Sequence, residues 1–196
     1  FKCLSVHIGS QILSNVPYQK MIRVVNSFIE KVSVNFEYVD FGGGMGIDYT
    51  SNKKTFDFKK LSLEINKFSK INECKIILEP GRSIIGDTAV LISKVIYIKE
   101  NLNKDFIILD AGMNDLIRPA LYNAKHMIIP ANKSSKKSKK EYDFVGPICE
   151  TSDRFLKTKK FQKLNEGDIV ILKDVGAYGY VLSSNYNVRP MPKEVL

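Results

Sequence analysis

The first 86 residues of this 196-residue chain alternate short apolar runs with longer amphipathic segments, and this order constrains the fold more than any other feature. In the longer segments the apolar side chains recur at the spacing of one helix face, as in Phe58, Leu61 and Ile65. A β-α-β-α-β order predicts parallel strands joined by helical crossovers. The predicted strands are residues 3–8, which we expect to be buried, 36–41 and 75–78, and the predicted helices are residues 18–32 and 57–71.

A polar or glycine-rich loop follows each of these predicted strands. In a parallel α/β barrel the loops after the carboxyl ends of the strands gather on one face, where active sites lie. We therefore expect the three loops to contribute to one site. They are His7-Ile8-Gly9-Ser10-Gln11, Gly42-Gly43-Gly44-Met45-Gly46 and Glu79-Pro80-Gly81-Arg82-Ser83.

Beyond residue 89 the pattern changes to short β-branched or aromatic runs separated by turn residues, without a long helical period. This pattern predicts an antiparallel β domain. We therefore divide the chain into an α/β domain over residues 1–89 and a β domain over residues 90–196. The predicted strands of the β domain are residues 90–99, 106–109, 127–130, 142–145, 168–173 and 178–183.

The net charge of +9 suggests a partner such as nucleic acid or an acidic membrane. Five of the lysines lie in residues 133–140, a run without aromatic side chains to stack on bases or apolar side chains to enter a membrane. We interpret this run as a solvated loop between two strands, and we expect no nucleic-acid or membrane partner. Three cysteines without metal-like spacing indicate free thiols, a cytoplasmic location and no metal site; they are Cys3, Cys74 and Cys149.

The loops of the first domain carry groups suited to a phosphorylated, flat ligand. The glycine run at residues 42–46 lets backbone N–H groups approach an anion, although a tight strand-to-helix turn is an equal alternative. Glu79 can pair with a ring nitrogen of a cofactor and Arg82 can grip a carboxylate, unless the two form a surface ion pair. His7 can stack on a flat ring while Ser10 bonds a phosphate, but a lone histidine is more often an ordinary core or surface residue.

The second domain carries three further candidate groups. Cys149 and Glu150 lie side by side in a Gly-Pro turn, where the thiol can donate a proton and the carboxylate can hold a cation. A plain turn is the alternative. Arg118 and Tyr122 are four residues apart and can clamp a substrate carboxylate. Tyr178 is flanked by glycines that let it project from a bend, and we assign no role to the histidine at position 126.

Together these motifs resemble the diaminopimelate decarboxylases, pyridoxal-phosphate enzymes with an alanine-racemase-like barrel and a β domain. The resemblance covers nearly the whole chain, because seven motifs occur in the order and approximate spacing of that family. It implies that residues 1–89 are the C-terminal part of the cofactor-binding barrel and that residues 90–196 are a β domain that is incomplete at its C-terminus. The motifs are residues 7–11, 42–44, 79–82, 110–122, 146–153, 176–179 and 184–190.

The resemblance implies decarboxylation of meso-2,6-diaminopimelate to L-lysine and carbon dioxide, the last step of lysine biosynthesis, by a homodimer with shared active sites. Cys149 is then the catalytic residue that protonates the α-carbon, and Glu79 pairs with the pyridine nitrogen of the cofactor. Pyridoxal 5′-phosphate is expected to contact His7, Ser10, Gly43, Gly44, Glu79, Pro80, Gly81, Arg82 and Tyr178. The substrate is expected to contact Arg82, Arg118, Tyr122, Glu150 and Tyr178.

The chain departs from this family in one respect. The family's Schiff-base lysine lies on an early barrel strand, and no lysine of this chain has the matching context. Because the chain also begins with Phe1 instead of Met, we interpret it as a C-terminal fragment that is inactive alone. Two alternatives remain open: a related decarboxylase for ornithine, arginine or carboxynorspermidine, and a non-catalytic remnant of the fold. Ornithine lacks a distal carboxylate for Arg118, so this residue discriminates between the substrates.

Overall fold

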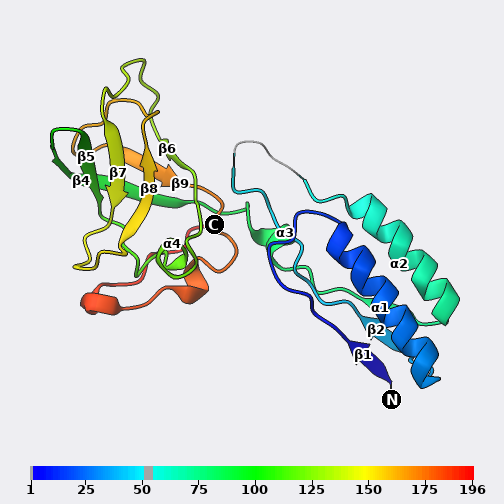
Figure 1. The fold of residues 1–196 in the computed structure, drawn as a ribbon. Helices are drawn as coiled ribbons and strands as arrows, with labels where there is room; N and C mark the ends of the chain where they lie inside the picture. The colour runs from blue at the N-terminus through cyan, green and yellow to red at the C-terminus, as the bar shows by residue number, and fades with distance from the viewer. Residues whose placement is uncertain (1, 51–54) are drawn as a thin grey trace. The chain divides into compact units, whose positions relative to one another are not determined.

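The computed structural model describes residues 2–50 and 55–196 and divides the chain into two compact units, Phe1–Ile84 and Ile85–Leu196 (Figure 1). The sequence pattern placed this division between residues 89 and 90. Each unit has its own hydrophobic core. Within the described ranges, no helix is both long enough and apolar enough to cross a membrane.

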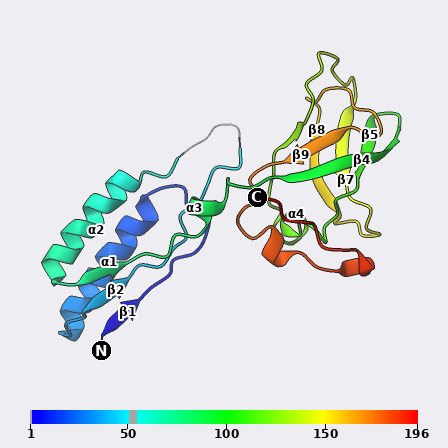
Figure 2. The same ribbon diagram turned by 180° about the vertical axis from the view of Figure 1, so that it is seen from behind.

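The first unit has three parallel strands in the order β1-β2-β3, with α1 and α2 covering one face of the sheet (Figures 1 and 2). The central residues of the strands, Leu4, Val39 and Ile76, are register partners and contribute to the core under the helices. This arrangement confirms the predicted β-α-β-α-β order. The elements are β1 (Cys3–Ser5), α1 (Val16–Val32), β2 (Tyr38–Asp40), α2 (Phe58–Asn72), β3 (Lys75–Ile77) and the short α3 (Arg82–Ile85).

Local signals set the ends of both long helices. The Asp57 side chain caps α2 by accepting the backbone N–H of Lys60 at 2.9 Å. At the other ends, Ser33 after α1 and Glu73 after α2 adopt the left-handed conformation, and their N–H groups bond carbonyls in the last turns. The helices are therefore closed by backbone geometry, while their apolar faces attach them to the sheet.

The first strand differs from the prediction that it is buried. β1 lies at one edge of the sheet, Cys3 and Ser5 are exposed, and only Leu4 points into the core side. Since side chains alternate across a strand, only one face of β1 can contact the helices. The prediction of a buried strand was therefore wrong for one face of β1, because the apolar composition of residues 3–8 does not show which face is covered.

The second unit contains a six-stranded sheet in the order β6-β9-β4-β5-β7-β8. Its core is centred on fully buried apolar side chains such as Val95, Ile107 and Phe144. The strands are β4 (Leu91–Lys99), β5 (Lys104–Leu109), β6 (Ile128–Pro130), β7 (Glu141–Val145), β8 (Arg154–Thr158) and β9 (Ile169–Leu172). The helical turns are α4 (Arg118–Tyr122), η1 (Tyr180–Leu182) and η2 (Tyr186–Val188).

Two predictions for this unit were wrong, and one strand was missed. The sheet is mixed instead of antiparallel, because β5 and β7 pair in parallel while the other neighbours pair antiparallel. The predicted strand at residues 178–183 is a loop with the 3₁₀ turn η1, because the flanking glycines and the left-handed Tyr178 prevent an extended run. The edge strand β8 was not predicted, because Arg154 and Lys157 leave only Phe155 and Leu156 as an apolar run.

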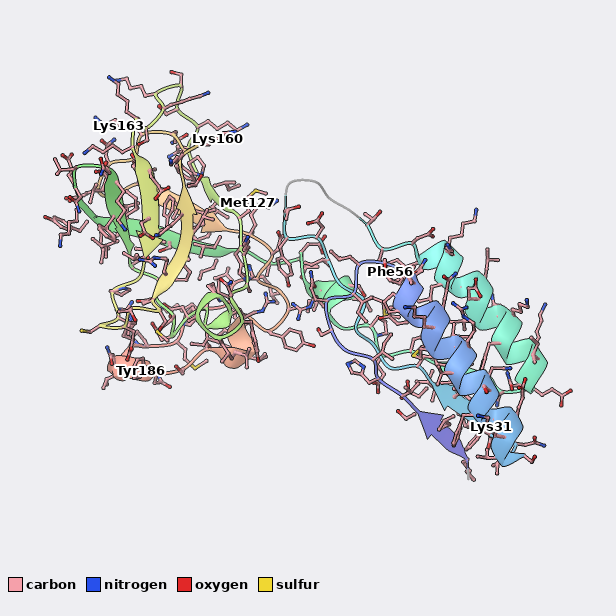
Figure 3. All side chains as sticks on the ribbon, in the orientation of Figure 1. Lys31, Phe56, Met127, Lys160, Lys163 and Tyr186 are labelled. Atoms are coloured by element: carbon pink, nitrogen blue, oxygen red, sulfur yellow. The ribbon has the colours of Figure 1, made fainter. Side chains whose placement is uncertain are left out.

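The lysine run at residues 133–140 lies between β6 and β7, as predicted for a loop between strands, and its lysines are exposed or half-buried. An isolated bridge joins Lys137 to Gln162, so this loop lies beside the loop between β8 and β9. That second loop carries Lys160 and Lys163, whose side chains are labelled in Figure 3. The two loops thus share one lysine-rich end of the unit.

Candidate active site

The three loops after β1, β2 and β3 meet at the carboxyl edge of the first sheet. The backbone N–H of Gly43 donates to Nδ1 of His7 at 3.3 Å, which links the first loop to the second. The N–H of Glu79 donates to the carbonyl of Gly42 at 2.9 Å, which links the second loop to the third. Arg82 closes the group, with Nη2 lying 3.4 Å from Oγ of Ser10. The structure therefore brings together candidate residues that are up to 75 positions apart.

The glycine run makes this close approach possible. A Cβ added to Gly43 would lie 2.1 Å from the carbonyl oxygen of Glu79, and one added to Gly44 would lie 2.2 Å from that of Gly9. Gly44 also has a φ of 94°, which favours glycine. The run does not lead directly into a helix, since α2 begins only at Phe58. Its glycines are required by the neighbouring loops, and not by a strand-to-helix turn.

Two residues that the sequence did not single out support the glycine run. The hydroxyl of Tyr18, on α1, donates to the carbonyl of Gly43 at 2.8 Å, and burial raises the pKa of Tyr18 to about 12. Asp40, the last residue of β2, accepts the N–H of Gly42 at 2.8 Å. Tyr18 looked like part of the apolar helix face and gave no separate signal. Asp40 could have been found as a buried carboxylate at the end of a strand.

The third loop carries polar side chains at the start of α3. Arg82 donates through Nη1 to the hydroxyl of Tyr49 at 2.6 Å, and its guanidinium lies over the Tyr49 ring, 5.9 Å from the centroid. Glu79 and Gly81 are exposed, and Pro80 between them is half-buried. The Ser83 hydroxyl is buried and has no hydrogen-bond partner among the described residues. This loop therefore presents a cation, a carboxylate and a hydroxyl next to glycine backbone.

In the second unit, Arg118 begins α4 with only 5% of its surface exposed, and its Nη1 lies 2.9 Å from Nε2 of His126. His126 is 1% exposed, and its Nδ1 lies 2.9 Å from the carbonyl oxygen of Lys173. Arginine has no acceptor atom, so Nε2 of His126 must be the acceptor and Nδ1 must carry the proton. His126 is therefore a neutral hydrogen-bond acceptor that orients Arg118. The sequence did not reveal this role.

Tyr122, at the other end of α4, is 62% exposed. The two predicted carboxylate-binding residues thus differ in environment: Arg118 is held in the interior, and Tyr122 lies at the surface. A buried guanidinium is expensive to leave without acceptors, whereas an exposed phenol is free to turn.

Cys149 and Glu150 are both exposed at the tip of the turn over residues 146–153. The Tyr186 hydroxyl donates to Oε1 of Glu150 at 2.6 Å, and this bond is the main reason that the pKa of Tyr186 is raised. The turn itself is closed by the N–H of Gly146, which donates to the carbonyl of Asp153 at 3.0 Å. A thiol and a carboxylate are therefore presented to solvent on a braced turn, and Tyr186 is an additional neighbour that the sequence did not assign.

Tyr178 projects from the loop after β9, as expected from its flanking glycines. It is 47% exposed and has a φ of 60°, a conformation that non-glycine residues seldom adopt outside tight turns. A Cβ on Gly176 would lie 1.9 Å from the carbonyl oxygen of Ile85, so the turn packs too closely for a side chain there. Strained positions of this kind are frequently found at ligand sites.

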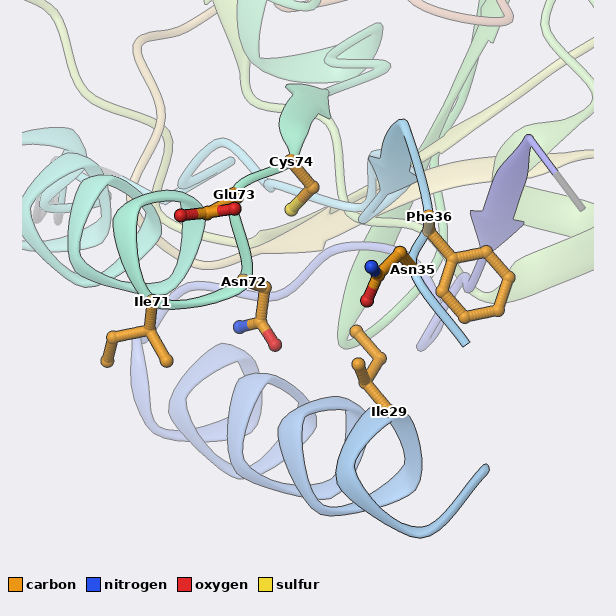
Figure 4. A pocket seen from close by; sticks show the side chains of 7 residues that line it. All are labelled: Ile29, Asn35, Phe36, Ile71, Asn72, Glu73 and Cys74. Carbon is orange, nitrogen blue, oxygen red and sulfur yellow. The ribbon is translucent and has the colours of Figure 1, made fainter. Parts of the chain in front are cut away.

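A cavity of about 260 Å³ lies in the first unit away from these residues (Figure 4). It is bounded by the C-terminal ends of α1 and α2 and by the residues that precede β2 and β3. It is therefore at the amino edge of the parallel strands, opposite the three loops. Its lining residues are Ile29, Asn35, Phe36, Ile71, Asn72, Glu73 and Cys74, and none of them is a predicted site residue.

Comparison with known proteins assigns this arrangement to a family. The family profile for the C-terminal sheet domain of pyridoxal-dependent decarboxylases matches residues 13–176, which is most of the chain. The chain belongs to the pyridoxal-dependent decarboxylase family. The predicted resemblance to this family is thereby confirmed. The match includes β2 to β9 together with α1 to α4, so it extends over both units.

Several decarboxylases of this family are close relatives in sequence. The diaminopimelate decarboxylase of Aquifex aeolicus is 43% identical over 193 residues, and that of Archaeoglobus fulgidus is 42% identical over 199 residues. Each alignment covers 97% of this chain, but only 46% of the first relative and 47% of the second. The chain thus spans about half the length of the curated relatives it matches.

Solved structures give the same result. The crystal structure of AQ1208 from Aquifex aeolicus has a TM-score of 0.90 and 41% identity, and it matches 97% of this chain with 48% of its own. The Helicobacter pylori diaminopimelate decarboxylase in complex with L-lysine has a TM-score of 0.84 and 39% identity, again over 97% of this chain and 48% of its own. The fold of both units is therefore shared with pyridoxal-dependent decarboxylases.

Proposed function

We propose that the full protein decarboxylates meso-2,6-diaminopimelate to L-lysine and carbon dioxide with pyridoxal 5′-phosphate as cofactor. The observation that carries the proposal is the 36–43% identity to diaminopimelate decarboxylases over 94–98% of the chain. The aligned region covers 94–98% of the chain, so it extends over both units. The proposal concerns the full protein because the chain matches only about half of each relative.

We further propose that the first unit is part of an α/β barrel of the alanine-racemase type. Its strands are parallel and its helices cover one face, while Cys3, Ser5, Lys75 and Ile77 point away from the helices and are exposed. Parallel sheets are generally covered on both faces or closed into barrels. Further strands of the full protein would complete the barrel to which this sheet belongs.

The residues at the carboxyl edge of the first sheet fit the phosphate and ring of this cofactor. The glycines let the backbones of the three loops approach one another, and the Ser83 hydroxyl has no partner among the described residues. Ser10, Gly44, Gly81 and Arg82 would hold the phosphate, as anions are held by backbone N–H groups and a guanidinium, and Gly43 would also contact the cofactor. His7 and Pro80 would contact the ring, and Glu79 would hold a proton at its nitrogen. When bound, the cofactor supplies an electron sink for the carbon that loses carbon dioxide.

The remaining candidates would act on the substrate. Arg82, Arg118 and Tyr122 would bind the distal carboxylate, and Glu150 would bind the distal ammonium group. Cys149 would deliver the proton that replaces the departing carboxylate, since a positioned thiol can act as a general acid. Tyr178 would contact both the phosphate and the substrate. Neutral His126 supports this assignment by orienting the guanidinium of Arg118.

The proposal extends to assembly and location. Cys149 and Glu150 are exposed on their turn, which suits residues that complete the site of a second copy in a homodimer. Cys3, Cys74 and Cys149 are free thiols, as expected for a protein of the reducing cytoplasm.

The direct test is to incubate the full protein with pyridoxal 5′-phosphate and meso-diaminopimelate, with L-ornithine and L-arginine in parallel reactions. We expect L-lysine and carbon dioxide in equal amounts from diaminopimelate only. Arg118→Gln should lower kcat/KM about ten- to several-hundredfold, because a charge-assisted contact to the substrate is lost. Arg23→Gln, on the exposed face of α1, is the matched control and should leave turnover unchanged.

Preferential turnover of ornithine or arginine would replace this proposal with that of a related decarboxylase. Carbon dioxide from none of the three substrates, in a protein that is folded and cofactor-loaded, would indicate a non-catalytic remnant of the fold.

A further inference from the structure

Asp153 ends the turn that presents the exposed thiol and carboxylate, and its own side chain points inward. Only 3% of its surface is exposed. Its Oδ2 accepts the backbone N–H of Ile148 at 2.7 Å, within the same turn. Its Oδ1 accepts the backbone N–H of Met113 at 2.7 Å, from the loop that follows β5. One buried carboxylate thus holds the backbone of two loops that are 40 positions apart in the chain.

The space around this carboxylate is closed. A Cβ added to Gly146 would lie 2.3 Å from Oδ2 and 2.4 Å from Oδ1 of Asp153. The loops also touch directly, since a Cβ on Gly112 would lie 3.0 Å from Cγ1 of Ile148 and 3.2 Å from Cδ of Pro147. The carboxylate therefore occupies the volume that a side chain at position 146 would need.

A second buried carboxylate reinforces the loop after β5. Asp115 accepts the N–H of Gly112 at 2.7 Å and Nδ2 of Asn114 at 2.9 Å. Burial is the main cause that raises the pKa of both Asp115 and Asp153, and the positive charge of Arg189 opposes this rise in both. Arg189 also donates to the carbonyl of Asp110. The positive charge of Arg189 therefore favours the charged form of both carboxylates.

We propose that Asp153 is a positioning residue that fixes the turn bearing Cys149 and Glu150 against the loop that leads into Arg118. The inference rests on the proposed function, because it assigns these three residues to one reaction. Neither loop belongs to the sheet, so bonds between the loops determine their relative position. Hydrogen bonds from N–H groups to a buried carboxylate are short and strong, and misplacement by about 1 Å can cost about 100-fold in rate.

The test is hydrogen–deuterium exchange together with kinetics on the full protein carrying Asp153→Asn. Asparagine keeps the shape of the side chain, but its amide N–H group would face the backbone N–H of either Met113 or Ile148. One of the two hydrogen bonds is therefore lost. We expect faster exchange in peptides containing Met113 and in peptides containing Ile148, with β4 and β9 unchanged. We also expect kcat/KM for lysine formation to fall about 10- to 100-fold. Asp105→Asn, which removes the ion pair of a half-buried carboxylate with Lys140 outside both loops, is the control and should leave both readouts unchanged.

Faster exchange confined to residues 146–153 would overturn the inference, because Asp153 would then stabilise only its own turn. Loosening of both loops with unchanged kcat/KM would overturn it as well. If Asp153→Asn does not fold, Gly146→Ala displaces the same carboxylate without removing its charge and should give the same coupled exchange. Absence of lysine formation in the parent protein would reject the proposed function, whereas the exchange result is independent of it.

Discussion

The two units position their candidate groups in different ways. At the carboxyl edge of the first sheet, three parallel strands deliver three loops to one place, and glycines such as Gly43 and Gly44 let the backbones approach. In the second unit, buried polar side chains position the candidate groups: Asp153 joins two loops, and His126 orients Arg118. The first arrangement depends on the absence of side chains, and the second depends on their presence. The two units should therefore be sensitive to opposite kinds of substitution.

The largest effect is expected at Gly43. Gly43→Ala should destabilise the protein by more than about 3 kcal/mol, because its Cβ would lie 2.1 Å from the backbone oxygen of Glu79, which cannot move alone. Gly9→Ala is the control within the same loops: φ is 123°, but nothing lies within 4 Å of an added Cβ. It should cost about 1–2 kcal/mol from backbone strain. Urea unfolding measures both, and equal losses would show that strain, not space, governs this edge.

The second largest effect is expected at His126. His126→Phe should destabilise the second unit by about 2–4 kcal/mol, because the buried Arg118 guanidinium loses one hydrogen-bond acceptor. Adding Arg118→Met should recover part of this loss, since the guanidinium N–H group that lost its acceptor is then absent. His7→Phe, at an exposed position, should cost less than about 1 kcal/mol. Thermal unfolding of the single and double variants measures these losses. If the losses of His126→Phe and Arg118→Met simply add in the double variant, the two residues are not coupled.

A smaller effect should appear as a pH dependence of the second unit. Burial raises the pKa of Asp115 from its ordinary value of 3.8, so folding favours the protonated form. The contribution of Asp115 is fully present below the unfolded pKa and is lost as the pH rises through the folded pKa. Relative to Asp115→Asn, the parent protein should thus lose stability as the pH is raised from about 4. Urea unfolding across this range measures the difference, and a constant difference would show that the folded pKa is not raised.

The smallest effect is expected in the lysine-rich loop, which relies neither on close glycine packing nor on buried polar groups. The double variant Lys136→Gln, Lys137→Gln should change the unfolding free energy by less than about 0.5 kcal/mol and leave turnover intact. The bridge between Lys137 and Gln162 and the bond from Lys163 to Lys136 use backbone atoms, so they survive the change. A loss above about 1 kcal/mol in urea unfolding would show that these ammonium groups contribute to the fold.

The first unit was easier to predict than the second. Its helices follow local periodicity and caps such as Asp57, and parallel pairing follows from the helical crossovers between the strands. In the second unit the strand β8 was missed, and the run at residues 178–183 was taken for a strand, because short runs there have weak alternation. The parallel pairing of β5 with β7 was also missed, because a long connection between them contains α4 and β6.

By itself, the sequence determined the α/β alternation, the lysine-rich loop and the chemistry available in each motif, because these depend on residue type and local spacing. Only the tertiary structure decided that Arg118 is buried beside His126, that Tyr18 supports Gly43, and that Asp153 binds Met113 across 40 positions. Those contacts join residues whose separation along the chain has no periodicity. They form because a buried polar group must find a partner wherever the fold brings one within reach.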